Sequence, residues 1–178
     1  AWYATATFGI KAKPVSEKFS RWAFALYLVT TLPVWMHHLL VDPTWSHAVK
    51  WIGATFIGIL LGIPSAMHGL AVPASVEKTL RSRGAPGLWG WLRQWGWDNP
   101  SMVLLAFSIV LFGIGGFDGT VGTTMQLNMT RHNNMWIPAH IHGALAGGTT
   151  LAFMAFSLGF LPHLGFEIKG KGWAKFQA

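Results

Sequence analysis

Four long stretches of the chain are almost entirely apolar, and polar residues gather between them. The stretches run approximately over residues 21–40, 48–76, 101–117 and 136–161. Because a helix needs about 20 apolar residues to cross the hydrocarbon core of a bilayer, this pattern predicts four transmembrane helices. We therefore expect an all-α membrane protein in which residues 1–178 form a single membrane segment.

Composition supports this prediction and removes one competing function. Hydrophobic residues make up 52% of the chain, charged residues only 11%, and the mean hydropathy is +0.39, so the chain has little of the charge that a soluble surface normally needs. The formal net charge of +7 would suit nucleic-acid binding. However, the basic residues lie in clusters between apolar stretches, which indicates membrane topology, and we expect no nucleic-acid partner.

The basic residues also predict an orientation. Four spans place residues 1–20, the 77–100 connection and the tail after Pro162 on one side of the membrane. Eleven of the 13 basic residues lie on that side or at its boundary, and only Lys50 and Arg131 lie toward the other. The positive-inside rule therefore predicts that both ends of this segment are cytoplasmic. The eleven residues are Lys11, Lys13, Lys18, Arg21, Lys78, Arg81, Arg83, Arg93, Lys169, Lys171 and Lys175.

Four histidines are predicted to lie at one depth near the outer face. His37 and His38 are close to the outer end of the first span, and His140 and His142 are a turn or so inside the outer end of the fourth. There is no cysteine, so histidine is the main available soft-metal ligand. Two residues along an α-helix make a turn of about 200°, so His140 and His142 would project from opposite faces and could hold two separate metal centres.

Other polar residues leave two interpretations open. His68, near Ser65 in the second span, could relay protons through water or could hydrogen-bond a neighbouring carbonyl. His132, beside Asn133 in an outer loop, could contact the acidic groups of a cofactor or make a loop hydrogen bond. His47 and His163 fall in connections or at an interface, and we expect both to be solvated.

Several motifs together resemble subunit I of the heme-copper oxidases, and most of all the B-class, ba-type cytochrome c oxidases. The similarity runs from about Tyr3 to Pro162, nearly the whole chain, and the pairing of His-His with His-x-His gives it specificity. The motifs are Thr31-Leu32-Pro33-Val34-Trp35-Met36-His37-His38, Asp42-Pro43, Pro64-Ser65, Trp97-Asp98-Asn99-Pro100 and His132-Asn133-Asn134-Met135-Trp136-Ile137-Pro138-Ala139-His140-Ile141-His142.

The resemblance implies a role for each histidine pair. In that family the paired histidines are two of three ligands of a copper ion, CuB, a role that His37 and His38 would take. His140 would be the axial ligand of the high-spin heme, and His142 would ligate the low-spin heme. His132 and Asn133 match positions near the propionates of the high-spin heme.

The resemblance also implies a proton path with departures from the family pattern. Ser65 matches a polar site on the path from the cytoplasm, and His68 stands where that path usually has a threonine. A second family threonine is Ala71 here, and Asn128 replaces an aspartate near the propionates. Tyr3 aligns with a later tyrosine of the path.

By resemblance the chain covers the seventh to tenth helices of a subunit with at least twelve. The third copper ligand and the second ligand of the low-spin heme would then lie outside it, so we expect a fragment or one part of a split subunit. The remaining part of subunit I, a subunit II with a copper electron-entry site and cytochrome c or a similar donor would be its partners. The location would be a prokaryotic plasma membrane.

The implied activity is that of a respiratory terminal oxidase, which reduces O2 to water with electrons from cytochrome c through the low-spin heme and couples this reaction to proton translocation. Three alternatives remain open at this point. One is a nitric oxide reductase on the same scaffold, and another is a non-catalytic diheme electron-transfer subunit without copper. The third is a membrane scaffold whose histidines serve only in packing.

Overall fold

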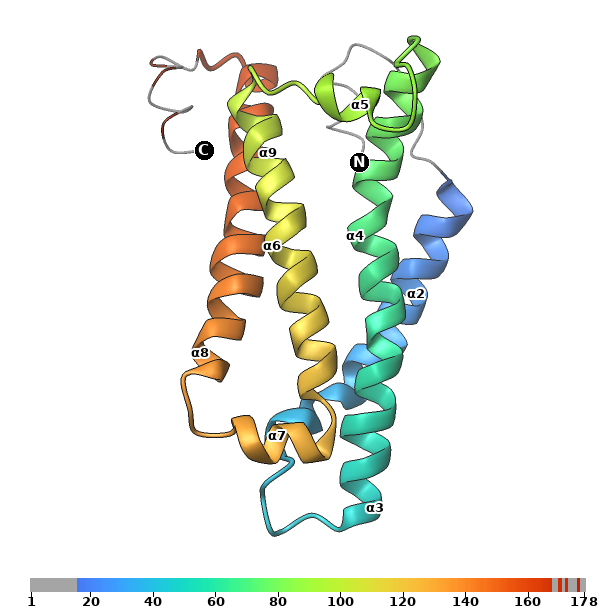
Figure 1. Ribbon diagram of the computed structural model, residues 1–178, viewed down its shortest axis with the longest axis vertical. Helices are drawn as coiled ribbons and strands as arrows, with labels where there is room; N and C mark the ends of the chain where they lie inside the picture. Colours follow the sequence, from blue (N-terminus) through green and yellow to red (C-terminus); the bar gives the residue numbers. More distant parts are fainter. Residues whose placement is uncertain (1–15, 168–169, 171, 173–175, 177–178) are drawn as a thin grey trace.

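The computed structural model describes residues 16–167, 170, 172 and 176, and within that part every regular element is helical. Four long helical rods run up and down the molecule in alternating directions, joined by short helices at both ends (Figure 1). The all-α prediction is therefore confirmed for these residues. Tyr3, the candidate at the start of the chain, lies outside them.

Three of the four rods change helix type along their length. The first is α2 (Glu17–Val34), which ends in the 3-10 helix η1 (Trp35–Leu39). The third is the uninterrupted helix α6 (Pro100–Gly122). The second rod consists of α3 (His47–Lys50), the π-helix η2 (Trp51–Phe56) and α4 (Ile57–Ser82). The fourth rod consists of α8 (Trp136–Ile141), the π-helix η3 (His142–Thr150), α9 (Leu151–Phe160) and the 3-10 helix η4 (Leu161–Leu164).

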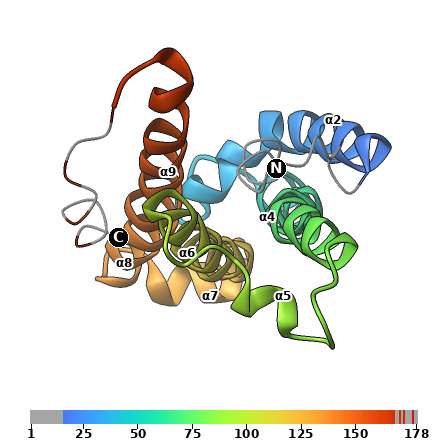
Figure 2. The same cartoon turned by 90° about the horizontal axis from the view of Figure 1, so that it is seen from above.

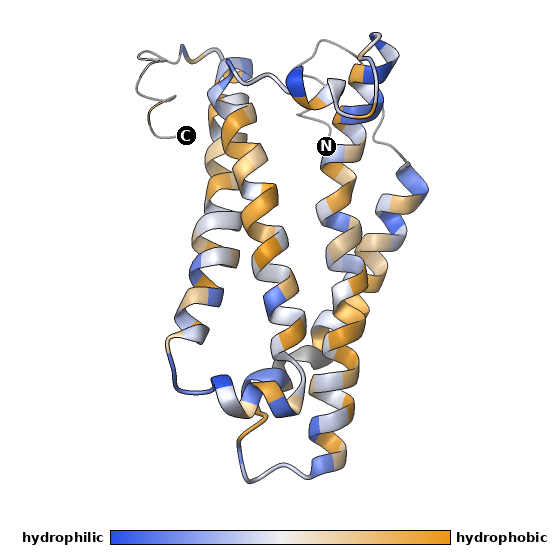
Figure 3. Ribbon diagram, viewed as in Figure 1, coloured by the Kyte–Doolittle hydropathy of each residue, from blue (hydrophilic) through white to orange (hydrophobic). Residues whose placement is uncertain are grey.

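Three rods are long and apolar enough to cross a membrane, counted over the residues that the structure describes: His47–Ser82, Pro100–Gly122 and Trp136–Leu164. Helix α2 is not among them, and its first five residues include Glu17, Lys18 and Arg21. Figure 3 shows apolar residues along the rods and polar residues concentrated in the connections at their ends. Helix α2 packs against α4. Because the first rod is not among these three helices, the first of the four expected spans remains a prediction.

The beginning of α6 follows from two adjacent residues. The Asn99 side chain accepts a hydrogen bond from the backbone N–H of Ser101 at 3.0 Å, and Pro100 occupies the first turn, where a missing N–H costs nothing. At its other end α6 continues past Phe117 to Gly122, beyond the limit expected from the glycine-rich sequence. Asp118 consequently lies inside the helix rather than in the loop that follows.

Helix α6 and the fourth rod lie very close together. The hydroxyl of Ser108 donates to the backbone oxygen of Gly148 at 2.7 Å, and the Ser101 hydroxyl donates to that of Ala155. A Cβ added at Gly115 would lie 2.7 Å from the backbone nitrogen of Ala144. Only glycine therefore permits this approach, which fixes the height of the fourth rod against α6.

The second rod also packs closely against α6, at the C-terminal end of that helix. Added Cβ atoms at Gly58 and Gly62 would lie 2.6 Å from Thr123 and 3.1 Å from Thr120, respectively. The buried hydroxyl of Thr55 donates to the Thr123 backbone oxygen at 2.9 Å and satisfies a carbonyl at the end of the helix. These contacts join η2 and α4 to the end of α6 that carries Asp118.

The opposite end of the molecule holds the main cluster of buried apolar side chains. The connection between α4 and α6, which contains the short helix α5 (Gly90–Arg93), folds back over the rod ends (Figure 2). Trp95 is buried against Val76, Leu80 and Met102, and its indole N–H donates to the Met102 backbone oxygen at 2.7 Å. This packing holds the rods together at the end away from the histidines.

Candidate metal centre

The paired histidines lie in the 3-10 turn that ends the first rod. The ring centroids of His37 and His38 are 3.8 Å apart, and their planes are tilted by 40°. The Asn128 side-chain amide donates to the backbone oxygens of Gly122, at 3.0 Å, and His37, at 3.5 Å. Asn128 belongs to α7 (Met125–Arg131), so it links the histidine turn to the segment that follows α6.

The two histidines of the fourth rod lie where its helix type changes. Helix α8 ends at Ile141, and the π-helix η3 begins at His142. Such π-helical segments are rare and often mark functional sites. His142 is exposed, and its Nδ1 lies 2.7 Å from the backbone oxygen of Pro138, whereas His140 is half-buried and turned toward α6.

One cavity of about 420 Å³ gathers several of the residues singled out from the sequence. Among its lining residues are His37, His38, His132, Asn133, Asp118 and His140, whereas His142 is not among the residues that line it. His38 and His140 lie close enough to interact electrostatically. The structure therefore brings both halves of the predicted centre together and separates His140 from His142.

The outer loop reaches this cavity through a sharp turn. His132 follows the last residue of α7, and its backbone N–H donates to the Asn128 oxygen at 2.8 Å. Asn133 has a positive φ of 59°, the left-handed conformation that asparagine tolerates better than most residues. This reversal directs the chain back into the fourth rod beside the cavity.

Sequence reasoning missed three residues of the site, Asp118, Arg131 and Trp136. The Asp118 carboxylate accepts hydrogen bonds from the Arg131 guanidinium at 3.2 Å and from the Trp136 indole at 2.9 Å. The Arg131 guanidinium also stacks over the Trp136 ring at 3.9 Å from its centroid. One signal was present, because Asp118 is the sole acidic residue of α6 and an ionisable residue in a span usually has a function.

Glycine at position 119 makes room for the His140 ring. A Cβ added at Gly119 would lie 2.8 Å from Cε1 of His140 and 3.4 Å from its Nε2. The ring edge therefore rests against the backbone of α6, one residue from Asp118. This contact fixes the side of the fourth rod on which His140 lies.

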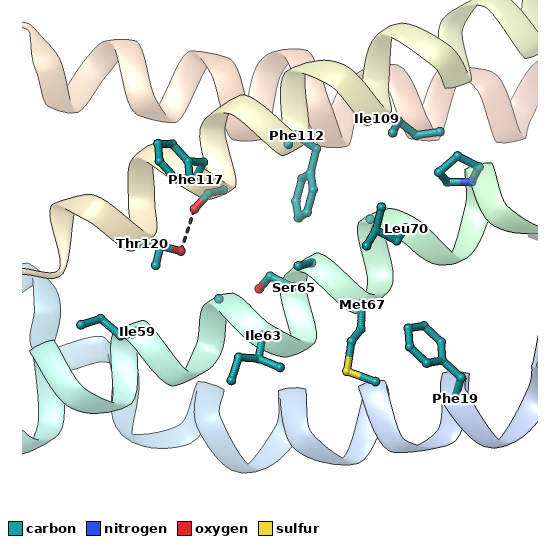
Figure 4. Close-up of a pocket in the computed structure, with 16 residues that line it drawn as sticks. Phe19, Ile59, Ile63, Ser65, Met67, Leu70, Ile109, Phe112, Phe117 and Thr120 are labelled. Carbon is teal, nitrogen blue, oxygen red and sulfur yellow. Dashed lines mark hydrogen bonds between the residues drawn. The ribbon is translucent and has the colours of Figure 1, made fainter. Parts of the chain in front are cut away.

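The predicted proton-path residues of α4 have different neighbours. Ser65 lines a second cavity of about 790 Å³ between α4 and α6, among mostly apolar side chains but together with Thr120 (Figure 4). His68 meets the ring of Tyr27 on α2 edge to face, with centroids 5.6 Å apart. Within the described chain, Ser65 thus faces a cavity and His68 contacts an aromatic ring, and a proton path through both residues remains a prediction.

The remaining two histidines lie away from the centre. His47 is the first residue of α3, and His163 lies in η4 at the far end of the fourth rod. Both are exposed, which is the environment expected from the sequence.

Comparison with known proteins identifies relatives of the whole chain. The model of the family described as "Cytochrome C and Quinol oxidase polypeptide I" matches residues 1–178. Cytochrome c oxidase subunit 1 of Thermus thermophilus is 36% identical over 152 residues, which are 85% of this chain and 27% of that protein. Quinol oxidase subunit 1 of Sulfolobus acidocaldarius is 23% identical over 155 residues, covering 87% of this chain and 26% of that protein.

A solved structure has the same arrangement of helices. A heme-copper terminal oxidase dimer studied by cryo-EM superimposes with a TM-score of 0.83 at 28% sequence identity. The match covers 90% of this chain and 29% of that one. The chain thus spans between a quarter and a third of the length of these three relatives.

Proposed function

The chain belongs to the cytochrome c and quinol oxidase polypeptide I family, and from this premise we propose that it forms the oxygen-reducing core of a respiratory terminal oxidase. The activity proposed for the whole enzyme is reduction of O2 to water with electrons from cytochrome c, coupled to proton translocation. One observation carries the proposal: His37, His38 and His140 face one cavity, and His142 is excluded from it.

The donor set fits the groups that this family implies. Imidazole nitrogens suit both copper and heme iron, and two adjacent rings on one turn are a natural partial site for a copper ion. Among the residues that the structure describes, no group of three or more His, Cys, Asp or Glu side chains could hold a metal alone. The family resemblance implies that a further copper ligand comes from another part of subunit I.

Bound hemes and copper would supply the redox chemistry, and the residues of this chain would bind and orient them. We assign His37 and His38 to CuB, His140 to the high-spin heme and His142 to the low-spin heme. The cavity supports the assignment of His132 and Asn133 to the propionate side, because both line it together with His140. Asparagine and histidine N–H groups can donate to carboxylates.

The proposal extends to the surroundings of the centre. We assign Ser65 and His68 to proton delivery from the cytoplasmic side, since both are polar residues on a helix that crosses the membrane. The rest of subunit I, a subunit II with a copper electron-entry site and the cytochrome c donor complete the complex. The location is a prokaryotic plasma membrane, with the connection between α4 and α6 on the cytoplasmic side.

Elemental analysis and oxygen consumption of the purified complex test the function. We expect two hemes and one CuB copper per copy of this chain, in addition to the copper of subunit II. His38→Ala should remove the CuB copper and the oxygen consumption while both heme spectra remain. His47→Ala, a change of the same kind at an exposed site, should keep the copper and the activity.

The alternatives give different results in the same measurements. Consumption of nitric oxide without consumption of O2 would identify a reductase on the same scaffold. Two hemes without copper at this centre would identify an electron-transfer subunit, and absence of heme from the purified complex would overturn the proposal altogether.

A further inference from the structure

The carboxylate of Asp118 is the one acidic group among the residues lining the proposed metal cavity. Its oxygen Oδ2 lies 3.4 Å from Nδ1 of His140. The side chains are only partly exposed, at 22% for Asp118 and 27% for His140. The contact joins α6 directly to the residue assigned as the axial ligand of the high-spin heme.

The second ring nitrogen of each assigned heme ligand has a different neighbour. Nδ1 of His142 lies within hydrogen-bond distance, 2.7 Å, of the Pro138 backbone oxygen, which is a neutral acceptor. Nδ1 of His140 is buried and makes no hydrogen bond within the described part of the chain. A histidine that binds a metal through one nitrogen almost always donates the other N–H to a carboxylate, a carbonyl or water.

The carboxylate is held at this position by groups on two other elements. The Arg131 guanidinium at the end of α7 and the Trp136 indole at the start of α8 donate to it. Gly119, the next residue of α6, leaves the space in which the His140 ring lies. A closure of about half an ångström would bring the Asp118 oxygen within ordinary hydrogen-bond distance of His140 Nδ1.

We infer that Asp118 is the positioning residue of the high-spin heme ligand: its carboxylate accepts the Nδ1–H of His140, leaves Nε2 for the iron and strengthens the imidazole as an electron donor. This inference rests on the proposed function, because it presumes that His140 binds iron. A carboxylate acceptor increases the basicity of a ligating imidazole more than a neutral carbonyl does. The fourth rod thereby supplies two histidine ligands of unequal basicity, one for each heme.

Two consequences can be measured apart from turnover. A stronger donor raises the iron–imidazole stretching frequency, and it stabilises the oxidised iron, which lowers the midpoint potential. Asp118→Asn keeps the size of the side chain and removes its charge. In the assembled complex we expect this change to shift the iron–imidazole band of the ferrous high-spin heme to lower frequency in resonance Raman spectra, and to raise the midpoint potential of that heme only.

The control is the carboxylate of Asp42, in the connection after η1. The Thr44 hydroxyl and the Thr44 backbone N–H donate to Asp42 at 2.6 and 2.8 Å, which lowers the pKa of its carboxyl, so it is charged at neutral pH. Asp42→Asn removes the same charge and should leave the iron–imidazole band in place. Asp118→Glu keeps the charge and should retain more of the wild-type frequency than Asp118→Asn does.

The outcomes separate this inference from the function on which it rests. An unchanged iron–imidazole band in Asp118→Asn, with the high-spin heme present, overturns the role of Asp118 and leaves the oxidase proposal intact. Equal downward shifts in Asp118→Asn and Asp118→Glu also overturn it, because charge would then not matter. A wild-type complex without any five-coordinate heme would instead refute the proposed function itself.

Discussion

His140 and His142 are two residues apart, yet they meet different parts of the molecule, and this difference can be tested. His140→Ala should abolish the carbon-monoxide-binding spectrum of the high-spin heme and leave the low-spin heme, because only His140 lines the cavity. Optical difference spectra and heme extraction would measure this. His163→Ala, at the exposed far end of the rod, serves as control, and equal loss of both hemes would contradict the two-faced arrangement.

The space beside His140 gives a second prediction. In Gly119→Ala the new methyl group would lie 2.8 Å from the ring, so the imidazole must rotate or shift. We expect the high-spin heme spectrum to shift or broaden while its content remains. Gly116→Ala is the matched control on the same helix, since nothing in the described chain lies within 4 Å of a Cβ there, and a similar spectral change in both variants would contradict the prediction.

At the residue scale the sequence was informative where chemistry is unusual for its surroundings. His37, His38 and His140 could be singled out because imidazoles are uncommon inside apolar stretches, and the alternation of spans put them at one depth. The contact between Asp118 and Trp136 was not predicted, because it joins residues of two elements that are 18 positions apart. No periodicity reports such a contact, which only packing creates.

At the element scale, the glycines of α6 control how closely the fourth rod can approach. Gly115→Ala would place a methyl group 2.7 Å from the Ala144 backbone, which must then move. Overpacking of this kind costs about 1–3 kcal/mol. We therefore expect a lower midpoint of thermal inactivation and, because Ala144 is close in sequence to both proposed heme ligands, altered spectra of both hemes.

Helix α6 supplies its own control for that experiment. Gly113 has no described atom within 4 Å of an added Cβ, so Gly113→Ala adds the same methyl group without the collision. Alanine is also the better helix former, by about 1 kcal/mol. Thermal inactivation of this variant at or above the wild-type midpoint is expected, and destabilisation equal to that of Gly115→Ala would refute the packing argument.

The helices themselves were predictable and their irregularities were not. Apolar length is enough to locate the rods, because the bilayer requires it of any helix that crosses. The extension of α6 to Gly122 was not predicted, because the apolar stretch ends at Phe117, directly before the charged Asp118. The change to a π-helix at His142 was not predicted, because the pattern of apolar residues indicates the length of a helix and not its hydrogen-bond register.

At the scale of the whole molecule, large apolar side chains remain uncovered on all rods. Leu32 is 79% exposed, Phe117 74% and Phe153 67%. The second cavity, which lies between α4 and α6, also has mostly apolar walls (Figure 4). Because the match covers only 27% of the Thermus relative, we expect other helices of subunit I to cover much of this surface.

Orientation in the membrane is a property of the whole molecule that the sequence predicts. The structure places the connection before α3 and the connection after α4 at opposite ends (Figure 1). Because the chain has no cysteine, Thr44→Cys and Ser82→Cys each introduce its single thiol at an exposed site in exchange for a hydroxyl. In spheroplasts, a membrane-impermeant maleimide should label the first variant, whereas the second should react only after lysis.

This labelling pattern is expected because of how the basic residues are distributed along the chain. The connection after α4 is surrounded by four basic residues, Lys78, Arg81, Arg83 and Arg93. Such clusters resist translocation across the membrane. Only Lys50 lies near the connection before α3. Labelling of Ser82→Cys in spheroplasts, with Thr44→Cys protected until lysis, would reverse the assignment. The histidine cavity would then lie toward the cytoplasm, and the result would contradict the proposed proton path from the cytoplasm through α4.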